Sequence, residues 1–145
     1  MKTTTANKIL WVSISILSLV IGGIIYLFFR SRTLYMFYYI PNDIITWIDR
    51  TTPSFIDIKN LEFVIYNLPA GLWTISYLIL MQLIIPDARG INRMIWIYSL
   101  PFILTFVEFL QLLNFVPGTF DFMDIIVYII PIIFSILIDI RYEKC

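Results

Sequence analysis

Four hydrophobic runs dominate this sequence and limit what it can fold into: residues 9–29, 68–85, 94–113 and 125–140. A helix that crosses a lipid bilayer needs about 20 apolar residues, within a range of roughly 17–25. The first and third runs have that length, and the second is near the lower limit. The fourth reaches it when residues 120–124 join the run. Backbone polar groups inside a bilayer must be satisfied internally, so we expect spanning helices.

Composition agrees with an all-α integral membrane protein. The chain is 60% hydrophobic and 14% charged, whereas average globular chains are about 45–50% apolar and about 25% charged. We therefore expect residues 1–145 to form one transmembrane domain, a four-helix bundle. Its expected spans are about 9–29, 68–85, 94–113 and 121–140. The first run is longer than the apolar part of a usual signal peptide, which favours a retained anchor.

The same composition excludes several chemistries. Histidine is absent and the only cysteine is Cys145, so this sequence has no imidazole for catalysis or metal binding and no intrachain disulfide. The net charge is zero, which gives no indication of a nucleic-acid partner. We assign no catalytic residue, metal ligand or cofactor from the sequence.

The distribution of basic residues predicts the orientation. Cytoplasmic loops of membrane proteins carry an excess of Lys and Arg. Placing both termini in the cytoplasm puts six basic residues inside, namely Lys2, Lys8, Arg89, Arg93, Arg141 and Lys144. It puts four outside, namely Arg30, Arg32, Arg50 and Lys59. Arg30 and Arg32 directly follow the first span and weaken this bias.

The long outer loop, residues 31–67, has two elements of its own. Residues 34–40 are aromatic and apolar, a composition enriched at the membrane interface. Pro41-Asn42-Asp43 then signals a helix start, after which Ile44, Ile45 and Ile48 share one helical face. We expect a short interfacial helix here, with a lid over a site as the alternative.

Polar residues gather at the predicted outer ends of the later spans: Asn67, Glu108, Gln111, Asp121 and Asp124. Glu108 precedes Asn114 by six residues, which places it roughly 9 Å below the outer end of its helix. A carboxyl group at that depth costs free energy and usually has a partner or a function. Gln111 is close enough along the helix to hydrogen-bond Glu108. We therefore predict a binding pocket formed by these residues.

The fourth helix carries a polar seam, because five residues fall within roughly 60° of one another on a helical wheel. They are Asp121, Asp124, Tyr128, Ser135 and Asp139. The seam either faces the bundle interior or forms a proton or ion path, and Tyr128 joins the candidate binding residues. Small residues at Ser18-x-x-x-Gly22 and Ala70-x-x-x-Thr74 predict close helix packing.

These residues resemble the VanZ-like family of small bacterial membrane proteins. The resemblance rests on Glu108-x-x-Gln111, a short turn at residues 117–119, and Asp121-x-x-Asp124. This sequence has Gly118 where many members have an arginine. The resemblance implies a multi-pass protein of the bacterial inner membrane with an envelope function, and some members are linked to glycopeptide tolerance.

Three classes of function remain open. The favoured one is a binding protein whose outer polar pocket takes a lipid headgroup, a lipid-linked cell-wall intermediate or an antibiotic. The second is a membrane enzyme with Glu108 or an aspartate as general base, and with Mg²⁺ held by Asp121 and Asp124. The third is an oligomeric assembly subunit or pore, with a second copy or another membrane protein as partner.

Overall fold

The structure is a computed structural model that describes residues 5–30, 32, 35–52, 65–85 and 91–143. Over these residues the protein has five α-helices and a short 3₁₀-helix, and it has no strand. The α-helices are α1 (Thr5–Phe29), α2 (Asn42–Thr51), α4 (Leu68–Ile84), α5 (Ile91–Leu112) and α6 (Phe122–Glu143), and the 3₁₀-helix is η1 (Tyr35–Tyr39). The all-α prediction is confirmed for this part of the chain.

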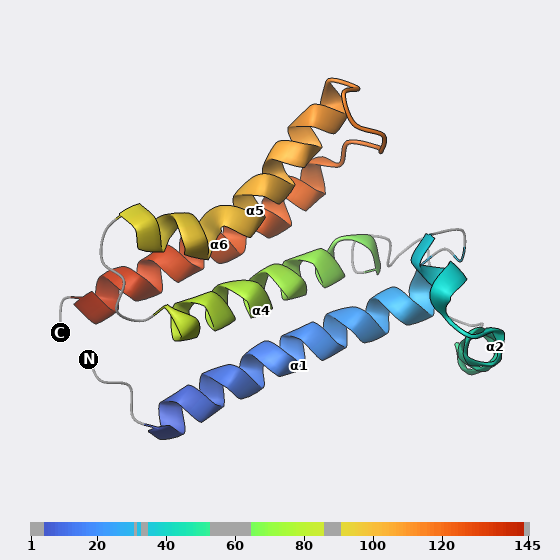
Figure 1. Cartoon of the computed structure of the whole chain (residues 1–145), viewed down its shortest axis with the longest axis horizontal. Coiled ribbons are helices and arrows are strands. Elements are labelled where there is room, and N and C mark those ends of the chain that lie inside the picture. The colour runs from blue at the N-terminus through green and yellow to red at the C-terminus, as the bar shows by residue number, and fades with distance from the viewer. Residues whose placement is uncertain (1–4, 31, 33–34, 53–64, 86–90, 144–145) are drawn as a thin grey trace.

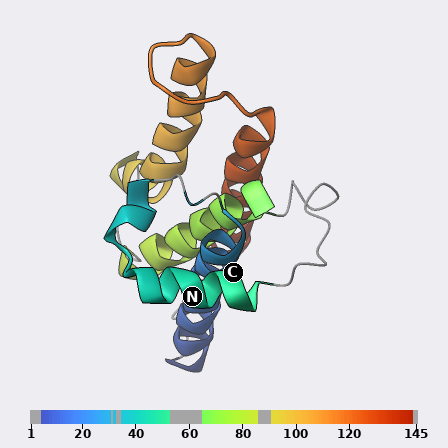
Figure 2. The same cartoon turned by 90° about the vertical axis from the view of Figure 1, so that its right-hand side faces the viewer.

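Four long helices run alternately in opposite directions along the molecule (Figure 1). The start of α1 and the end of α6 lie at one end, and α2 lies across the other end (Figure 2). The central helix is α4, which packs against α1, α5 and α6. The four helices match the four predicted segments to within a few residues. The predicted loop helix is also present as α2.

Two of these helices, α1 over Asn7–Phe29 and α5 over Ile91–Leu112, are long and apolar enough to cross a membrane. Only 11% and 17% of their most apolar windows are buried, unlike the core helix of a soluble domain. The apolar helices α4 and Phe122–Leu137 of α6 are shorter. This exposed apolar surface favours a lipid environment.

Small residues let α1 and α4 approach closely. The Ser15 hydroxyl lies 2.9 Å from the Ser76 hydroxyl and donates to the Ser76 carbonyl at 3.0 Å, and both side chains are buried. About two turns further along α1, Gly22 lies against Trp73 of α4. The indole N–H of Trp73 donates to the Leu19 carbonyl at 3.3 Å. The close-packing prediction therefore holds for Gly22, and Ser15 makes a second close contact between α1 and α4 through Ser76.

Two residues of the predicted polar seam on α6, Ser135 and Tyr128, face the bundle interior. Ser135 is buried, and it contacts Gln82 of α4 and Tyr98 of α5 through hydrogen bonds. Tyr128 is also buried. These contacts support the bundle-interior interpretation of the seam, while the side chain of Asp139 lies outside the described residues.

The helix α2 is tied to the end of α1 by an ion pair and by ring contacts. The Arg32 guanidinium lies 2.7 Å from Asp49 and also donates to the Leu27 carbonyl. Trp47 meets Phe28 edge to face, with ring centroids 6.2 Å apart. Ile48 is buried, and Ile44 and Trp47 remain largely exposed. This geometry suits a helix that presents apolar side chains at a membrane surface.

The two neighbouring glycines of α1 offer a matched test of the packing. A Cβ at Gly22 would lie 2.7 Å from Trp73 Nε1 and 3.2 Å from the Pro69 carbonyl, whereas a Cβ at Gly23 meets nothing within 4 Å. We expect Gly22→Ala to lower the thermal midpoint of the purified protein, because such overpacking costs about 1–3 kcal/mol. Gly23→Ala should keep or raise it, because Ala is the better helix former. Equal midpoints for the two variants would contradict the close α1–α4 contact.

Candidate functional site

The polar residues predicted as a pocket come from three elements that meet at the α2 end of the molecule. Asn67 directly precedes α4, Glu108 lies in the last two turns of α5, and Asp121 and Asp124 lie at the start of α6. Because α5 ends where α4 and α6 begin, the alternating directions of the helices bring these four residues to one level. We call them the carboxylate cluster.

Asn67 joins the two aspartates of the cluster. Its amide nitrogen donates to Asp121 Oδ2 at 3.2 Å and to Asp124 Oδ1 at 3.1 Å. A side-chain amide has two N–H donors, and both are used here. Asn67 is only 4% exposed, and its two hydrogen bonds to the half-buried aspartates fix the start of α4 to the start of α6.

Glu108 connects the cluster to α5. It is 7% exposed, and its Oε2 accepts the backbone N–H of Asp121 at 3.3 Å. Asp121 in turn caps α6, because its Oδ1 accepts the backbone N–H of Met123 at 2.8 Å. Both oxygens of Asp121 therefore serve structural contacts. Within the described residues no donor contacts Oδ2 of Asp124 or Oε1 of Glu108. Of these two carboxylates only Asp124 lines the adjacent pocket, which makes it the one best placed for a ligand.

Gln111 has a different role from the one the sequence predicts. Within the described part of the chain it makes no hydrogen bond to Glu108, and its side chain lies instead against the Cα of Gly118. A Cβ at position 118 would come within 2.7 Å of Gln111 Cδ, and Gly118 has a φ of +147° that few other residues adopt. Gln111 thus supports the turn that leads to Asp121.

The end of α5 shows why that turn is well defined. Asn114 has a φ of 57°, its N–H bonds to the Gln111 carbonyl, and the N–H of Phe115 bonds to the Leu110 carbonyl. This is the Schellman pattern of a helix C-terminus, in which a residue with positive φ closes the last turn. Asn114 therefore ends α5 and sends the chain back toward α6.

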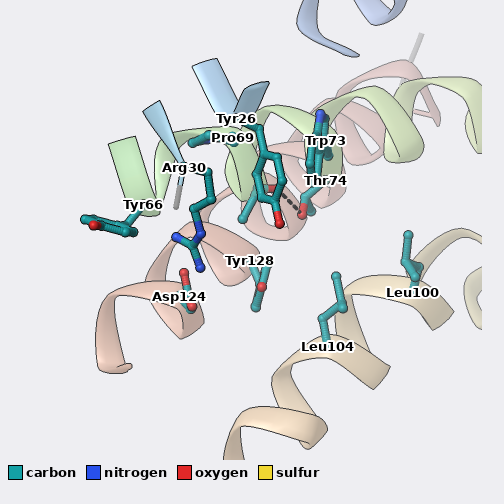
Figure 3. Close-up of a pocket in the computed structure, with 11 residues that line it drawn as sticks. Tyr26, Arg30, Tyr66, Pro69, Trp73, Thr74, Leu100, Leu104, Asp124 and Tyr128 are labelled. Atoms are coloured by element: carbon teal, nitrogen blue, oxygen red, sulfur yellow. Dashed lines mark hydrogen bonds between the residues drawn. The ribbon is translucent and has the colours of Figure 1, made fainter. Parts of the chain in front are cut away.

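A pocket of about 400 Å³ lies beside the carboxylate cluster. Side chains from or next to four helices line it, including Asp124 and Tyr128 from α6, Trp73 and Thr74 from α4, and Leu104 from α5 (Figure 3). The pocket is polar near Asp124 and becomes apolar toward Leu100 and Leu104. That gradient matches an amphiphilic molecule better than a wholly polar one.

Asp124 and Tyr128 are the predicted site residues that line this pocket, and most of its lining, including Tyr26, Arg30 and Tyr66, is not predicted from the sequence. Arg30 directly follows α1, and its guanidinium carbon lies 4.7 Å from the centre of the Tyr66 ring and 5.7 Å from that of Tyr26. Figure 3 shows the guanidinium pointing toward Asp124. The sequence does carry one signal for Arg30. Arg30 and Arg32 follow the first span on the predicted outer side, where the orientation rule disfavours basic residues.

Arg30 and its neighbour Arg32 have different surroundings. Arg32 forms the only ion pair within the described part of the chain, with Asp49 of α2. Arg30 has no carboxylate within ion-pair distance among the described residues, although it is half-buried and faces Asp124 across the pocket. Arg30 thus combines a fixed position on two aromatic rings with N–H donors that are available to a ligand.

Comparisons with known proteins do not add to this description. No model of a known protein family matches the chain, and no curated protein or solved structure matches it. Among the described residues, no three carboxylates are grouped so that they could hold a metal ion. The chemistry of the carboxylate cluster and of the adjacent pocket therefore carries the functional argument.

Proposed function

We propose that this chain is a multi-pass protein of the bacterial inner membrane that binds the headgroup of a membrane lipid, or of a lipid-linked cell-wall intermediate, at the pocket beside the carboxylate cluster. The observation that carries this proposal is the convergence of Asn67, Glu108, Asp121 and Asp124 at one end of the helices, next to a pocket with an apolar interior. A glycopeptide antibiotic is the further ligand that the family resemblance suggests.

The cost of placing carboxyl groups among apolar helices supports a functional site. An ionised residue at mid-membrane costs about 2.5–3.5 kcal/mol on insertion scales, and less near the edge. Packing alone would be served as well by apolar residues. Asp124 keeps one oxygen without a donor among the described residues and turns it toward the pocket. That arrangement is suited to a polar ligand.

The VanZ-like assignment remains part of this proposal. Its supporting geometry is that Glu108 and Asp121 contact one another through a hydrogen bond, and that Gln111 packs on Gly118 between them. The Glu108-x-x-Gln111 and Asp121-x-x-Asp124 parts of the motif therefore contact the same turn between α5 and α6. Many members have an arginine where this chain has Gly118, and here Arg30, which directly follows α1, brings a guanidinium to the pocket that Asp124 lines.

The other two classes have less support. The small-residue contacts at Ser15 and Gly22 are used inside the chain against α4, so they are not available for oligomer formation. For a membrane enzyme, the described residues offer carboxylates but no nucleophile hydrogen-bonded to one of them. The binding function is therefore the one that we carry forward.

The orientation that belongs to this proposal places the carboxylate cluster outside and both termini in the cytoplasm. It rests on the distribution of basic residues and on the alternating directions of the four helices. Reporter fusions after Lys59, Gly90, Gly118 and Cys145 should read outside, inside, outside and inside. A cytoplasmic reading for the Gly118 fusion would place the cluster on the wrong side of the membrane.

The binding site can be tested with two isosteric variants, Glu108→Gln and Asp124→Asn. Each keeps an oxygen that can accept the hydrogen bond seen in the structure, removes the charge, and replaces the second oxygen by an NH2 group. We expect membrane abundance and thermal midpoint to stay unchanged. The amount of phospholipid that co-purifies with the protein, measured by mass spectrometry, should fall in both variants. The fall should be about tenfold for Asp124→Asn, whose carboxylate lines the pocket, because a charge-assisted hydrogen bond contributes about 1.5–3 kcal/mol.

The matched control is Asp43→Asn, which removes a carboxylate from exposed α2 at the same end of the molecule. It should leave both lipid retention and abundance unchanged. If Glu108→Gln and Asp124→Asn instead lose abundance and thermal stability in step with lipid retention, the cluster only holds the helices together and the binding proposal is wrong.

A further inference from the structure

The pocket presents charges of both signs to a ligand, and the two signs come from opposite walls. Arg30 follows α1, whereas Asp124 and Tyr128 belong to α6. Figure 3 shows Arg30 and Asp124 facing each other at the same end of the pocket. They are not within ion-pair distance, so each keeps donors or acceptors for a third group.

The position of Arg30 is fixed by its aromatic neighbours. Its guanidinium lies over the rings of Tyr66 and Tyr26, and Tyr26 in turn contacts Trp73 with ring centroids 5.3 Å apart. A guanidinium that lies over aromatic rings is attracted by their faces and keeps its N–H groups available to other partners. Such a group binds the oxygens of a phosphate by paired hydrogen bonds.

The carboxylates exclude a simple anion as the ligand. A phosphate bound at Arg30 alone would face Asp124, and beyond it Glu108 and Asp121, which are joined to Asp124 by the contacts described above. Like charges in a setting of low polarity repel strongly. A simple cation would in the same way meet Arg30. A ligand with one charge of each sign meets neither repulsion.

The opposite end of the pocket indicates an attached apolar chain. Leu104 and Leu100 lie four and eight residues before Glu108 on α5, so Leu100 is roughly 12 Å from the level of the carboxylate cluster. Trp73 completes the apolar wall from α4. α1 and α5 make at most slight contact with each other. An acyl chain can therefore leave between them toward the lipid.

We infer that the pocket binds a zwitterionic amino-phosphate lipid headgroup, with its phosphate on Arg30 and its ammonium group on Asp124. This inference rests on the proposed function and names the class of ligand for the same pocket. An ammonium group with N–H donors suits Asp124 Oδ2, and the hydroxyls of Tyr128 and Thr74 lie in the same lining. A primary amine fits this role better than a quaternary one, which has no N–H.

The test is a binding titration of the purified full chain in detergent with three short-chain lipids. Phosphatidylethanolamine has both groups, phosphatidylglycerol lacks the amine, and phosphatidylcholine lacks the N–H donors. We expect phosphatidylethanolamine to bind at least tenfold more tightly than either of the others. Soluble phosphoethanolamine, which has the headgroup without the tail, separates the two sources of this chemistry. Phosphoethanolamine should compete only weakly with phosphatidylethanolamine, because it lacks the apolar chain that contacts the apolar end of the pocket.

Two variants separate the two halves of the headgroup site. Arg30→Gln should weaken phosphatidylethanolamine binding at least tenfold, with partial rescue by Arg30→Lys, which keeps the charge and loses the paired donors. Asp124→Asn should remove the preference for phosphatidylethanolamine over phosphatidylglycerol. The matched control is Arg50→Gln, which removes an exposed guanidinium from α2 at the same end of the molecule and should change nothing.

The outcomes of this titration distinguish the headgroup assignment from the more general proposal that the pocket binds a lipid. Equal affinity for all three lipids, unaffected by Arg30→Gln but reduced by Asp124→Asn, would overturn the headgroup assignment and leave lipid binding at the cluster standing. Tightest binding of phosphatidylglycerol would overturn the assignment of the ammonium group to Asp124. An absence of binding for every lipid would overturn both proposals.

Discussion

The side-chain amide of Asn67 is the point on which the arrangement at the α2 end depends. Its two N–H groups hold Asp121 and Asp124, and the backbone of Asp121 in turn donates to Glu108. Three helix ends are thereby joined through the buried Asn67 and Glu108 and the half-buried aspartates. Without such partners these groups would carry the full cost of burial in an apolar setting, so the cluster positions α4, α5 and α6 as a unit. The same contacts leave Asp124 directed into the pocket.

The pocket itself follows from how α1 is attached. α1 packs along α4 through Ser15 and Gly22 and makes little contact with α5. This attachment leaves space above α4 that Trp73 and Tyr26 only partly fill. It also carries Arg30 past the end of α1 to the level of the carboxylate cluster. A strongly apolar α1 is thus the element that supplies the positive charge of the site.

The sequence predicts the helices well because each apolar run is long and has clear ends, such as Asn67 directly before α4, Pro69 in its first turn, and Asp121 before α6. It also predicts that Glu108 and the aspartates gather, since the alternating direction of helices of similar length fixes their level. It does not predict Arg30, because that position depends on the register between α1 and α4, set by contacts such as Gly22 with Trp73. Helical spacing alone predicts that Gln111 contacts Glu108, but the turn at Gly118, which has a positive φ, brings the backbone against the Gln111 side chain instead.

Photo-crosslinking tests the central claim, that a lipid headgroup lies between Arg30 and Asp124, most directly. A phosphatidylethanolamine analogue with a diazirine next to its amine would be activated in membranes that contain the protein, and the labelled residues would be located by mass spectrometry. We expect labelling of Asp124 and of pocket residues beside it, such as Tyr66 and Tyr128, and loss of that labelling in Arg30→Gln. Labelling confined to the exposed faces of α1 and α5, with the pocket residues unmodified, would contradict it.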